Sequence, residues 1–327
     1  MKRFLHPRMN FNLLLENLSN PALLFFVLGI IAVLLKSDLE IPANSSKFIS
    51  LYLLFAIGFK GGQELSHEPL NAQIFWSMLF GVGIATIIPL YTFFILKRKL
   101  NVFNAGAIAA AYGSVSAVTF VTAVSYLETQ QMHLHGHMVA IMALMESPAI
   151  IMGLLLISIF NKDEATQINK SSAIRHSFTN GSVLLILGSL IIGYLANAKA
   201  AEGIKPFTND LFKGFLAIFL LDMGITSGRK LKDFFSFGWF PSVFALLMPL
   251  INGTLIALLS ASVTNDISNR FIFAVLAASA SYIAVPAAMK ISVPKANPGL
   301  FLPMALAITF PVNITIGMPL YLWIVQL

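Results

Sequence analysis

Two stretches rich in glycine, alanine and serine occupy corresponding positions in the two halves of the chain. The first runs Ala110–Thr119 (AAYGSVSAVT) and the second runs Ala277–Pro286 (AASASYIAVP). Each lies within an apolar segment long enough to cross a bilayer, and small residues leave little side chain between the backbone and a ligand. Paired small-residue interruptions in corresponding halves indicate the substrate site of a membrane transporter.

The chemistry that these stretches offer is anion binding. Pro286 lacks a backbone N–H and favours a helix break just before it. If two inverted helices break at the same depth, both half-helix N-termini face one point, where unpaired N–H groups and positive dipole ends attract a small anion. The alternative is that the small residues only permit tight helix packing. The candidate anion-site residues are Gly113, Ser114, Val115, Ser116, Thr119, Ser279, Ala280, Ser281 and Tyr282.

Ionisable side chains inside apolar segments are costly and therefore indicate function. Carboxylate, amide and hydroxyl oxygens, with carbonyls freed by a proline, suit a hard cation such as Na⁺. A protonatable carboxylate could instead couple a proton. For Asp222, an interhelical pair or a helix cap is an equal alternative. The candidate sodium ligands are Glu146, Ser147, Thr309, Asn313 and Asp222.

Transition-metal and enzymatic chemistry are less favoured. His133, His135 and His137 alternate in a loop and could bind a metal, but a hydrated loop is the favoured interpretation, so no transition-metal site is predicted. The chain has no cysteine, which excludes disulfides and thiolate ligands. No nucleophile–base pair falls within the predicted crossings, so an enzyme is disfavoured and no cofactor is expected apart from a co-transported Na⁺.

The composition is that of an integral membrane protein. Of the 327 residues, 57% are hydrophobic and 11% charged, whereas a soluble domain carries about 25% charged residues. Mean hydropathy is +0.82. The net charge of +7 would suggest a nucleic-acid partner in a soluble protein. Here Lys and Arg lie mostly in short loops, where they set membrane topology, so an all-α membrane protein without a nucleic-acid partner is predicted.

The apolar segments fit ten transmembrane helices in two five-helix repeats. Residues 1–160 form the first repeat and include a short amphipathic surface helix at Met9–Asn20. Residues 161–178 form a cytoplasmic linker, and residues 179–327 form the second repeat. An odd number of crossings per repeat inverts the second repeat relative to the first. The predicted crossings are residues 21–36, 47–63, 73–96, 104–127, 138–160, 179–197, 210–228, 238–262, 269–290 and 299–325.

Further matches between the halves support the repeat. Leu54–Leu65 aligns without a gap on Leu220–Leu231, and both segments carry GxxxG, which permits close helix approach in lipid. The fifth and tenth crossings share a central proline, at Pro148 and Pro311. Three matches in the same order favour an internal repeat over chance.

Loop charge predicts the orientation in the membrane. The loops that follow the odd-numbered crossings hold more Lys and Arg than the opposite loops, so the positive-inside rule places them in the cytoplasm and both termini outside. The basic start of the chain, Met1–Arg8, argues for the opposite orientation. This start resembles a signal peptide, but residues 36–40 offer no small-residue cleavage site, so the first helix is expected to be retained.

Three motifs carry a resemblance to a known family. With Gly58–Gly62 (GFKGG), Gly113–Thr119 (GSVSAVT) and Ser279–Ala288 (SASYIAVPAA), the chain resembles the bacterial sodium-dependent bicarbonate transporter family over essentially its whole length. The resemblance implies ten helices in two inverted repeats, a core and a gate domain, a homotrimer, and Na⁺-driven bicarbonate uptake. Together with the loop charges, it predicts a multi-pass protein of the bacterial inner membrane with periplasmic termini. It also implies that Gly113–Ser116 and Ser279–Tyr282 line the bicarbonate site, with sodium near Glu146 and Asn313.

The resemblance implies a cytoplasmic regulator as well, a PII-like trimer that binds and inhibits the transporter. The predicted linker is shorter than in cyanobacterial members, which puts that regulation and the substrate in question. The resulting hypothesis is a sodium symporter that takes up bicarbonate by alternating access, with an elevator-like core moving against the first, second, sixth and seventh helices. Alternatives are a carrier of another small organic anion, a cation/proton antiporter, a channel or a non-transporting sensor.

Overall fold

The computed structural model describes residues 21–69, 71–161, 181–234 and 237–327, and every regular element in these ranges is a helix. The predicted surface helix at Met9–Asn20 and nearly all of the predicted linker lie outside the described residues. The described helices of the first half are α2 (Pro21–Leu34), α3 (Ala43–His67), α4 (Ala72–Leu96), α5 (Val102–Gly113), α6 (Ala117–Thr129) and α7 (Gly136–Phe160).

The described part of the second half has the same succession of long, short and broken helices. It ends in one nearly continuous rod in which α-helical turns alternate with wider π-helical turns on either side of Pro311. Its helices are α9 (Gly181–Leu195), α10 (Ala198–Lys205), η1 (Pro206–Asp210), α11 (Phe212–Phe234), α12 (Trp239–Leu259), η3 (Ser260–Ser262), α13 (Ile267–Ala278), α14 (Ala284–Ser292), α15 (Pro298–Pro303), η4 (Met304–Thr309), α16 (Phe310–Val312), η5 (Asn313–Gly317) and α17 (Met318–Val325).

Among the described residues, six helical segments are long and apolar enough to cross a membrane, and three shorter ones are also apolar. The prediction of an all-helical fold is therefore confirmed for these residues. Each predicted crossing contains helix, with a break inside the fourth and the ninth, and the number of ten crossings stays a prediction. The inverted arrangement of two five-helix repeats stays a prediction.

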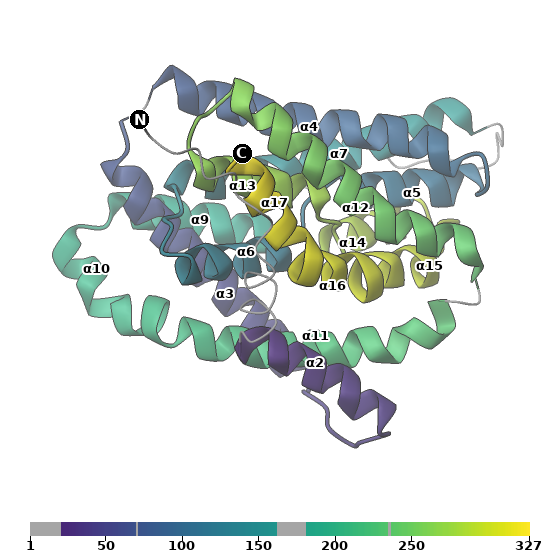
Figure 1. Cartoon of the computed structure of the whole chain (residues 1–327), viewed down its shortest axis with the longest axis horizontal. Helices are drawn as coiled ribbons and strands as arrows, with labels where there is room; N and C mark the ends of the chain where they lie inside the picture. The colour runs from purple at the N-terminus through teal and green to yellow at the C-terminus, as the bar shows by residue number, and fades with distance from the viewer. Residues whose placement is uncertain (1–20, 70, 162–180, 235–236) are drawn as a thin grey trace, which may run out of the picture.

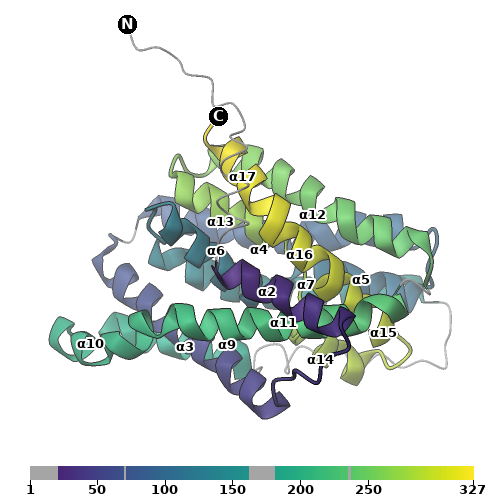
Figure 2. The ribbon, with the colours of Figure 1, turned by 60° about the horizontal axis from the view of Figure 1, so that its bottom comes forward.

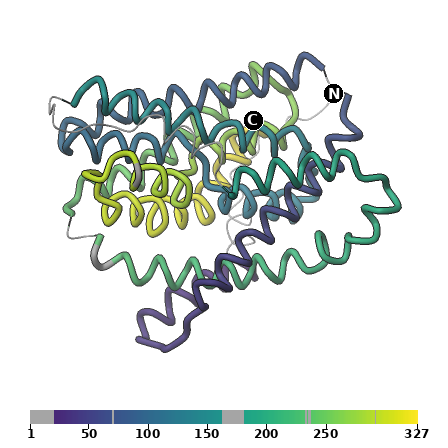
Figure 3. Tube along the Cα trace, turned by 180° about the vertical axis from the view of Figure 1, so that it is seen from behind, coloured from purple at the N-terminus to yellow at the C-terminus, as the bar shows by residue number. Residues whose placement is uncertain are grey.

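Two tightly crossed helix pairs form one side of the molecule. α2 packs on α11 and α3 packs on α9, and we call these four the scaffold helices. At the first crossing, a Cβ on Gly224 would lie 2.1 Å from the Phe26 carbonyl oxygen; at the second, a Cβ on Gly193 would lie 2.2 Å from that of Phe59. Only glycine allows backbones to approach this closely, which explains the small residues that the sequence places there. Figure 1 shows α2 and α11 along the lower edge, Figure 2 brings them forward, and Figure 3 shows α3 running diagonally from behind.

The remaining long helices, α4 to α7 and α12 to α17, form the core. α4 packs against α5 and α7, and α12 packs against α13 and α17. The Tyr91 hydroxyl of α4 donates to Asn252 Oδ1 of α12 at 2.5 Å and joins the two halves of the core, and the Tyr321 hydroxyl of α17 donates to the Pro249 carbonyl of α12 at 2.9 Å within the second half. These partners satisfy polar groups that lipid would leave unpaired.

The two helices that lead to the small-residue stretches start alike. α5 and α13 are each 12 residues long, and each begins with an Asx N-cap. Asn101 Oδ1 accepts from the Asn104 N–H at 2.8 Å, and Asp266 Oδ1 accepts from the Asn269 N–H at 2.8 Å. Because their caps and lengths match, α5 and α13 each reach a break after the same number of helical turns.

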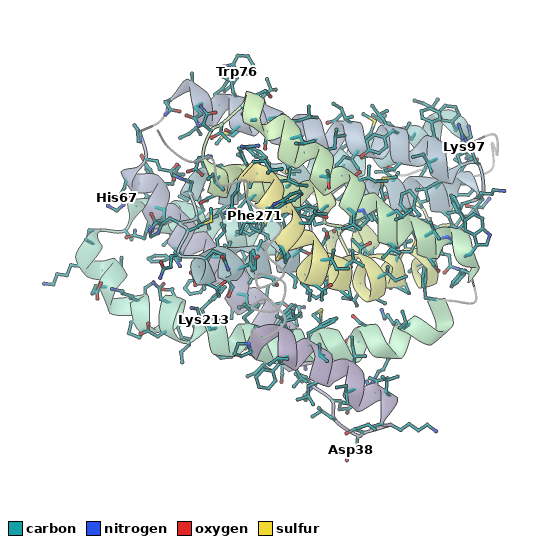
Figure 4. All side chains as sticks on the ribbon, in the orientation of Figure 1. Asp38, His67, Trp76, Lys97, Lys213 and Phe271 are labelled. Atoms are coloured by element: carbon teal, nitrogen blue, oxygen red, sulfur yellow. The ribbon has the colours of Figure 1, made fainter. Side chains whose placement is uncertain are left out.

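The polar loops gather at the ends of the helix bundle. His67, after the second predicted crossing, and Lys97, after the third, lie at opposite ends in Figure 4, as loops on opposite membrane faces must. Asp38 marks a further loop on the scaffold side, and Lys213 lies at the start of the scaffold helix α11.

The close crossing of α3 and α9 yields a stability test. We expect Gly193→Ala to lower the thermal unfolding midpoint of the purified protein, because overpacking of a tight contact costs about 1–3 kcal/mol. Gly188→Ala in the same helix is the matched control: nothing lies within 4 Å of its added Cβ, and Ala is favoured over Gly in a helix by about 1 kcal/mol. A midpoint for Gly193→Ala equal to or above that of Gly188→Ala would contradict the close packing.

Candidate functional site

Both small-residue stretches are helix breaks. α5 ends at Gly113 and α6 begins at Ala117, and the intervening Ser114 and Ser116 have extended backbone conformations. In the second half, α13 ends at Ala278 and α14 begins at Ala284. Pro286 falls in the first turn of α14, where its missing N–H needs no partner. The predicted interruptions are therefore present in both halves.

The two breaks cross and hydrogen-bond each other. The Ser116 N–H donates to Ser279 Oγ at 3.0 Å, and the Ser281 N–H donates to the Ala111 carbonyl at 2.8 Å. The carbonyl of Ala278, freed by the end of α13, accepts from Asn313 Nδ2 at 2.8 Å. Protein groups thus satisfy the backbone that the breaks expose, which is the condition for irregular backbone at membrane depth.

The hydroxyls of Ser116 and Ser281 cap the half-helices that follow them. Ser116 Oγ accepts from the Thr119 N–H at 3.1 Å, and Ser281 Oγ accepts from the Val285 N–H at 3.3 Å. The helix α6 therefore begins directly after its N-cap Ser116, whereas α14 begins three residues after Ser281, with Ile283 at the N-cap position. Since the first N–H groups of a helix have no partner within it, both helices direct donors and positive dipole ends toward this crossing.

A small cavity of about 20 Å³ lies at the crossing. Core residues from three helices line it, and one residue comes from the scaffold helix α9, so the cavity lies where the core meets the scaffold. The volume admits about one water-sized group. The lining residues are Val115, Ser116, Ala117, Glu146, Ser182, Ser281, Tyr282, Ile283 and Ala284.

Glu146 gives the cavity its ionisable group. The side chain, on α7 two residues before Pro148, is buried, and its Oε1 atom has no hydrogen-bond partner among the described residues. A buried carboxylate without partners is costly unless a proton or a cation neutralises it. Ser147, the next residue, is also buried.

The other predicted anion-site residues support the crossing rather than line the cavity. Gly113 lets α5 approach α4, because a Cβ there would lie 2.2 Å from Pro89. Ser114 is buried, and its hydroxyl has no partner among the described residues. Ala280 is buried within the second break, and Thr119 lies one turn into α6.

The predicted sodium ligands are spread over three places. Thr309 lies deeper in the core, where its hydroxyl donates to the Ala245 carbonyl at 2.8 Å and lies 2.7 Å from that of Tyr112. Asn313 bridges the end of α13 and the Tyr321 hydroxyl, which is 3.0 Å from Asn313 Oδ1. Of the set, Glu146 alone lines the cavity described above.

Asp222 belongs to a different cavity because it lies on the scaffold helix α11. It accepts a hydrogen bond from the Ser46 hydroxyl of α3, which fits the interhelical pair considered from the sequence. This second cavity has a volume of about 410 Å³ and shares Ser182 and Ile283 with the small cavity. It extends to Glu40 and Lys47, beside the loop that holds Asp38 in Figure 4. The larger cavity therefore lies next to the crossing, on the side of this end of the molecule.

Ion pairs join scaffold and core on the other side of the crossing. Glu128 at the end of α6 pairs with Lys60 of α3, and Lys213 Nζ of α11 lies 3.8 Å from Glu128 Oε2. A cavity of about 200 Å³ borders these side chains. The sequence patterns single out neither Lys60 nor Ser182 nor Glu128 as a site residue. The intramembrane position of Lys60 within GFKGG is the one signal that could have drawn attention to this contact.

The histidine loop is less hydrated than the sequence predicts. His133 is exposed and His135 is partly buried, but His137 is only 5% exposed. The prediction of a hydrated loop is wrong for His137, because this residue begins α7 and its Nδ1 lies 2.7 Å from Glu68 Oε2.

One comparison with known proteins covers nearly the whole chain. A family model described as the Na⁺-dependent bicarbonate transporter superfamily matches residues 21–326. No curated protein matches the chain significantly. The family match confirms the resemblance that the glycine and small-residue motifs indicate.

Proposed function

The chain belongs to the Na⁺-dependent bicarbonate transporter superfamily and is a multi-pass membrane protein, and we propose that it couples inward movement of Na⁺ to uptake of bicarbonate. The observation that carries this proposal is the crossing of two broken helices. The half-helix α6 begins directly after Ser116 and α14 begins shortly after Ser281, and both serines line one cavity together with Glu146.

The crossing suits a small oxyanion. None of the residues that line the cavity among the described residues is Lys or Arg. The attraction comes instead from hydroxyls and from helix N-termini, each worth up to about 2 kcal/mol in a partly buried geometry. Binding of this strength holds an anion without trapping it, which transport requires. The family match, and not the volume of the cavity, supports bicarbonate as the anion.

Glu146 provides the coupling. A charged carboxylate beside the anion repels it, whereas a cation bound at Glu146 removes the repulsion and relieves the buried charge. Each solute then raises the affinity of the protein for the other by the same factor, typically about 5- to 150-fold. A proton on Glu146 would serve the same electrostatic role, and it defines the main competing mechanism.

Access to the crossing differs between its two sides. The cavity beside Asp222 leads away from the crossing toward the loops predicted to be cytoplasmic. On the opposite side, Glu128 ties α6 to the scaffold. This asymmetry supports transport by alternating access, with the structure in an inward-open state. Elevator-like movement of the core past the scaffold then exposes the site to the outside. Outward movement must break the Glu128 contacts.

Assembly and regulation are proposed from the family alone: a homotrimer in the bacterial inner membrane and a cytoplasmic PII-like regulator. The periplasmic position of the termini is proposed from the loop charges. Residues 162–180, where such a regulator is expected to bind, lie outside the described residues.

Uptake of ¹⁴C-bicarbonate into proteoliposomes tests the function. We expect an inward Na⁺ gradient to drive accumulation, and Glu146→Gln to abolish the dependence on Na⁺, because the amide carries no charge for the cation to neutralise. Equal uptake by the unmutated protein with and without the gradient would refute the coupling. Accumulation driven by a proton gradient alone would favour the proton mechanism, and competition by organic anions would redefine the substrate.

The serine pair is tested separately. We expect Ser116→Ala and Ser281→Ala each to weaken bicarbonate binding by roughly 10- to 100-fold, since a hydrogen bond to a charged group contributes about 1.5–3 kcal/mol. Ser77→Ala is the matched control, because Ser77 is buried in α4 and its hydroxyl has no partner among the described residues. Unaltered binding in both site variants, with normal expression, would reject the anion site.

A further inference from the structure

A second cluster of ligand-type side chains lies away from the crossing, where α3 ends and where α7 and α13 begin. Glu68, His135 and His137 each offer one ligand atom there, and these atoms lie within 4.8 Å of one another. The transport mechanism proposed above makes no use of these three residues.

Both histidines turn their Nδ1 atoms to one carboxylate. His137 Nδ1 lies 2.7 Å from Glu68 Oε2, and His135 Nδ1 lies 3.5 Å from Glu68 Oε1. The Gly136 N–H, between the two histidines, donates to Glu68 Oε1 at 2.6 Å and fixes the carboxylate against the start of α7. His137 is buried, and its Nε2 has no partner among the described residues.

The outer nitrogen of His135 is held by a second carboxylate. His135 Nε2 lies 3.3 Å from Asp266 Oδ2, while Asp266 Oδ1 accepts from the Asn269 N–H at 2.8 Å. Metal-binding histidines commonly donate their second ring N–H to a carboxylate, which orients the ring and strengthens the metal bond. Asp266 is placed to play that part for His135.

We propose that this cluster binds one transition-metal ion of the Zn²⁺ class. Glu68 and the Nδ1 atoms of His135 and His137 supply three ligands, and water supplies the fourth. Zinc bonds of about 2.0–2.2 Å in a tetrahedron place ligand atoms about 3.3–3.6 Å apart. The Glu68–His135 separation already has this value, and the remaining separations require only local adjustment. The mixed nitrogen and oxygen ligands favour Zn²⁺ over Mg²⁺ or Na⁺.

Without a metal, Glu68, Asp266 and the two histidines form a network of ion pairs and hydrogen bonds. A bound metal must replace part of this network. Hydrogen bonds to Asp266 and Glu68 raise the pKa of His135 to about 10. Burial raises the pKa of Glu68, but hydrogen bonds from His135 and His137 outweigh it and hold the pKa of that carboxyl well below its usual range. A bound metal must displace these hydrogen bonds.

The cluster also joins the scaffold to the core. Glu68 follows the scaffold helix α3, whereas the histidines and Asp266 begin core helices. A bound ion at this position restrains the core against the scaffold on the side opposite the large cavity. This consequence rests on the proposed transport function, whereas the metal site itself does not.

Calorimetric titration of ZnCl₂ into the purified, chelator-treated full-length protein, with any histidine tag removed, tests the site. We expect one Zn²⁺ to bind per chain. His135→Gln and His137→Gln should each weaken binding at least 10-fold, and Asp266→Asn about 10- to 100-fold. His133→Gln is the matched control, since His133 lies exposed in the same loop outside the cluster, and should bind as the unmutated protein does.

Other results of the same titrations would overturn the proposed metal site. Absence of stoichiometric binding, or equal binding by the unmutated protein and by His135→Gln, identifies the cluster as an ion-pair network only. If His137→Gln fails to fold, His135→Gln and Asp266→Asn still decide, because both residues are partly exposed. Equal binding of Mg²⁺ would also overturn the assignment.

Discussion

The arrangement of the core depends on how two helix breaks satisfy their freed backbone inside lipid. No water reaches such groups unless the protein admits it, so each break must find its partners within the protein. Here the breaks satisfy each other, through Ser116 and Ser279 on one side and Ser281 and Ala111 on the other. That exchange fixes the crossing point, and the crossing point brings two capped helix N-termini to one cavity.

Charge balance gives the crossing its proposed mechanism. Helix N-termini and hydroxyls attract an anion, and Glu146 beside them opposes it until a cation or a proton arrives. The same logic acts at the boundary between core and scaffold. Glu128 holds that boundary on one side with Lys60 and Lys213, and Asp222 lies in the open cavity on the other. Movement of the core must exchange one set of contacts for another.

Local patterns in the sequence predict the helices, both breaks and the glycine crossings, because each rests on short-range physics: small residues, N-caps and apolar length. They do not predict which distant side chains meet. Thr309 and Asn313 have the right chemistry for sodium but are engaged within the core, whereas Ser182 reaches the cavity from a helix that shows no sign of a site. His137 looks like a loop residue but is buried because Glu68, remote in sequence, covers it.

The central claim is that an anion at the crossing and a cation at Glu146 stabilise each other. The most direct measurement is a pair of binding titrations on the purified protein: bicarbonate with and without saturating Na⁺, and Na⁺ with and without saturating bicarbonate. The account predicts that each solute tightens binding of the other by one common factor well above one. Bicarbonate affinity that is the same in the presence and absence of Na⁺ would contradict it.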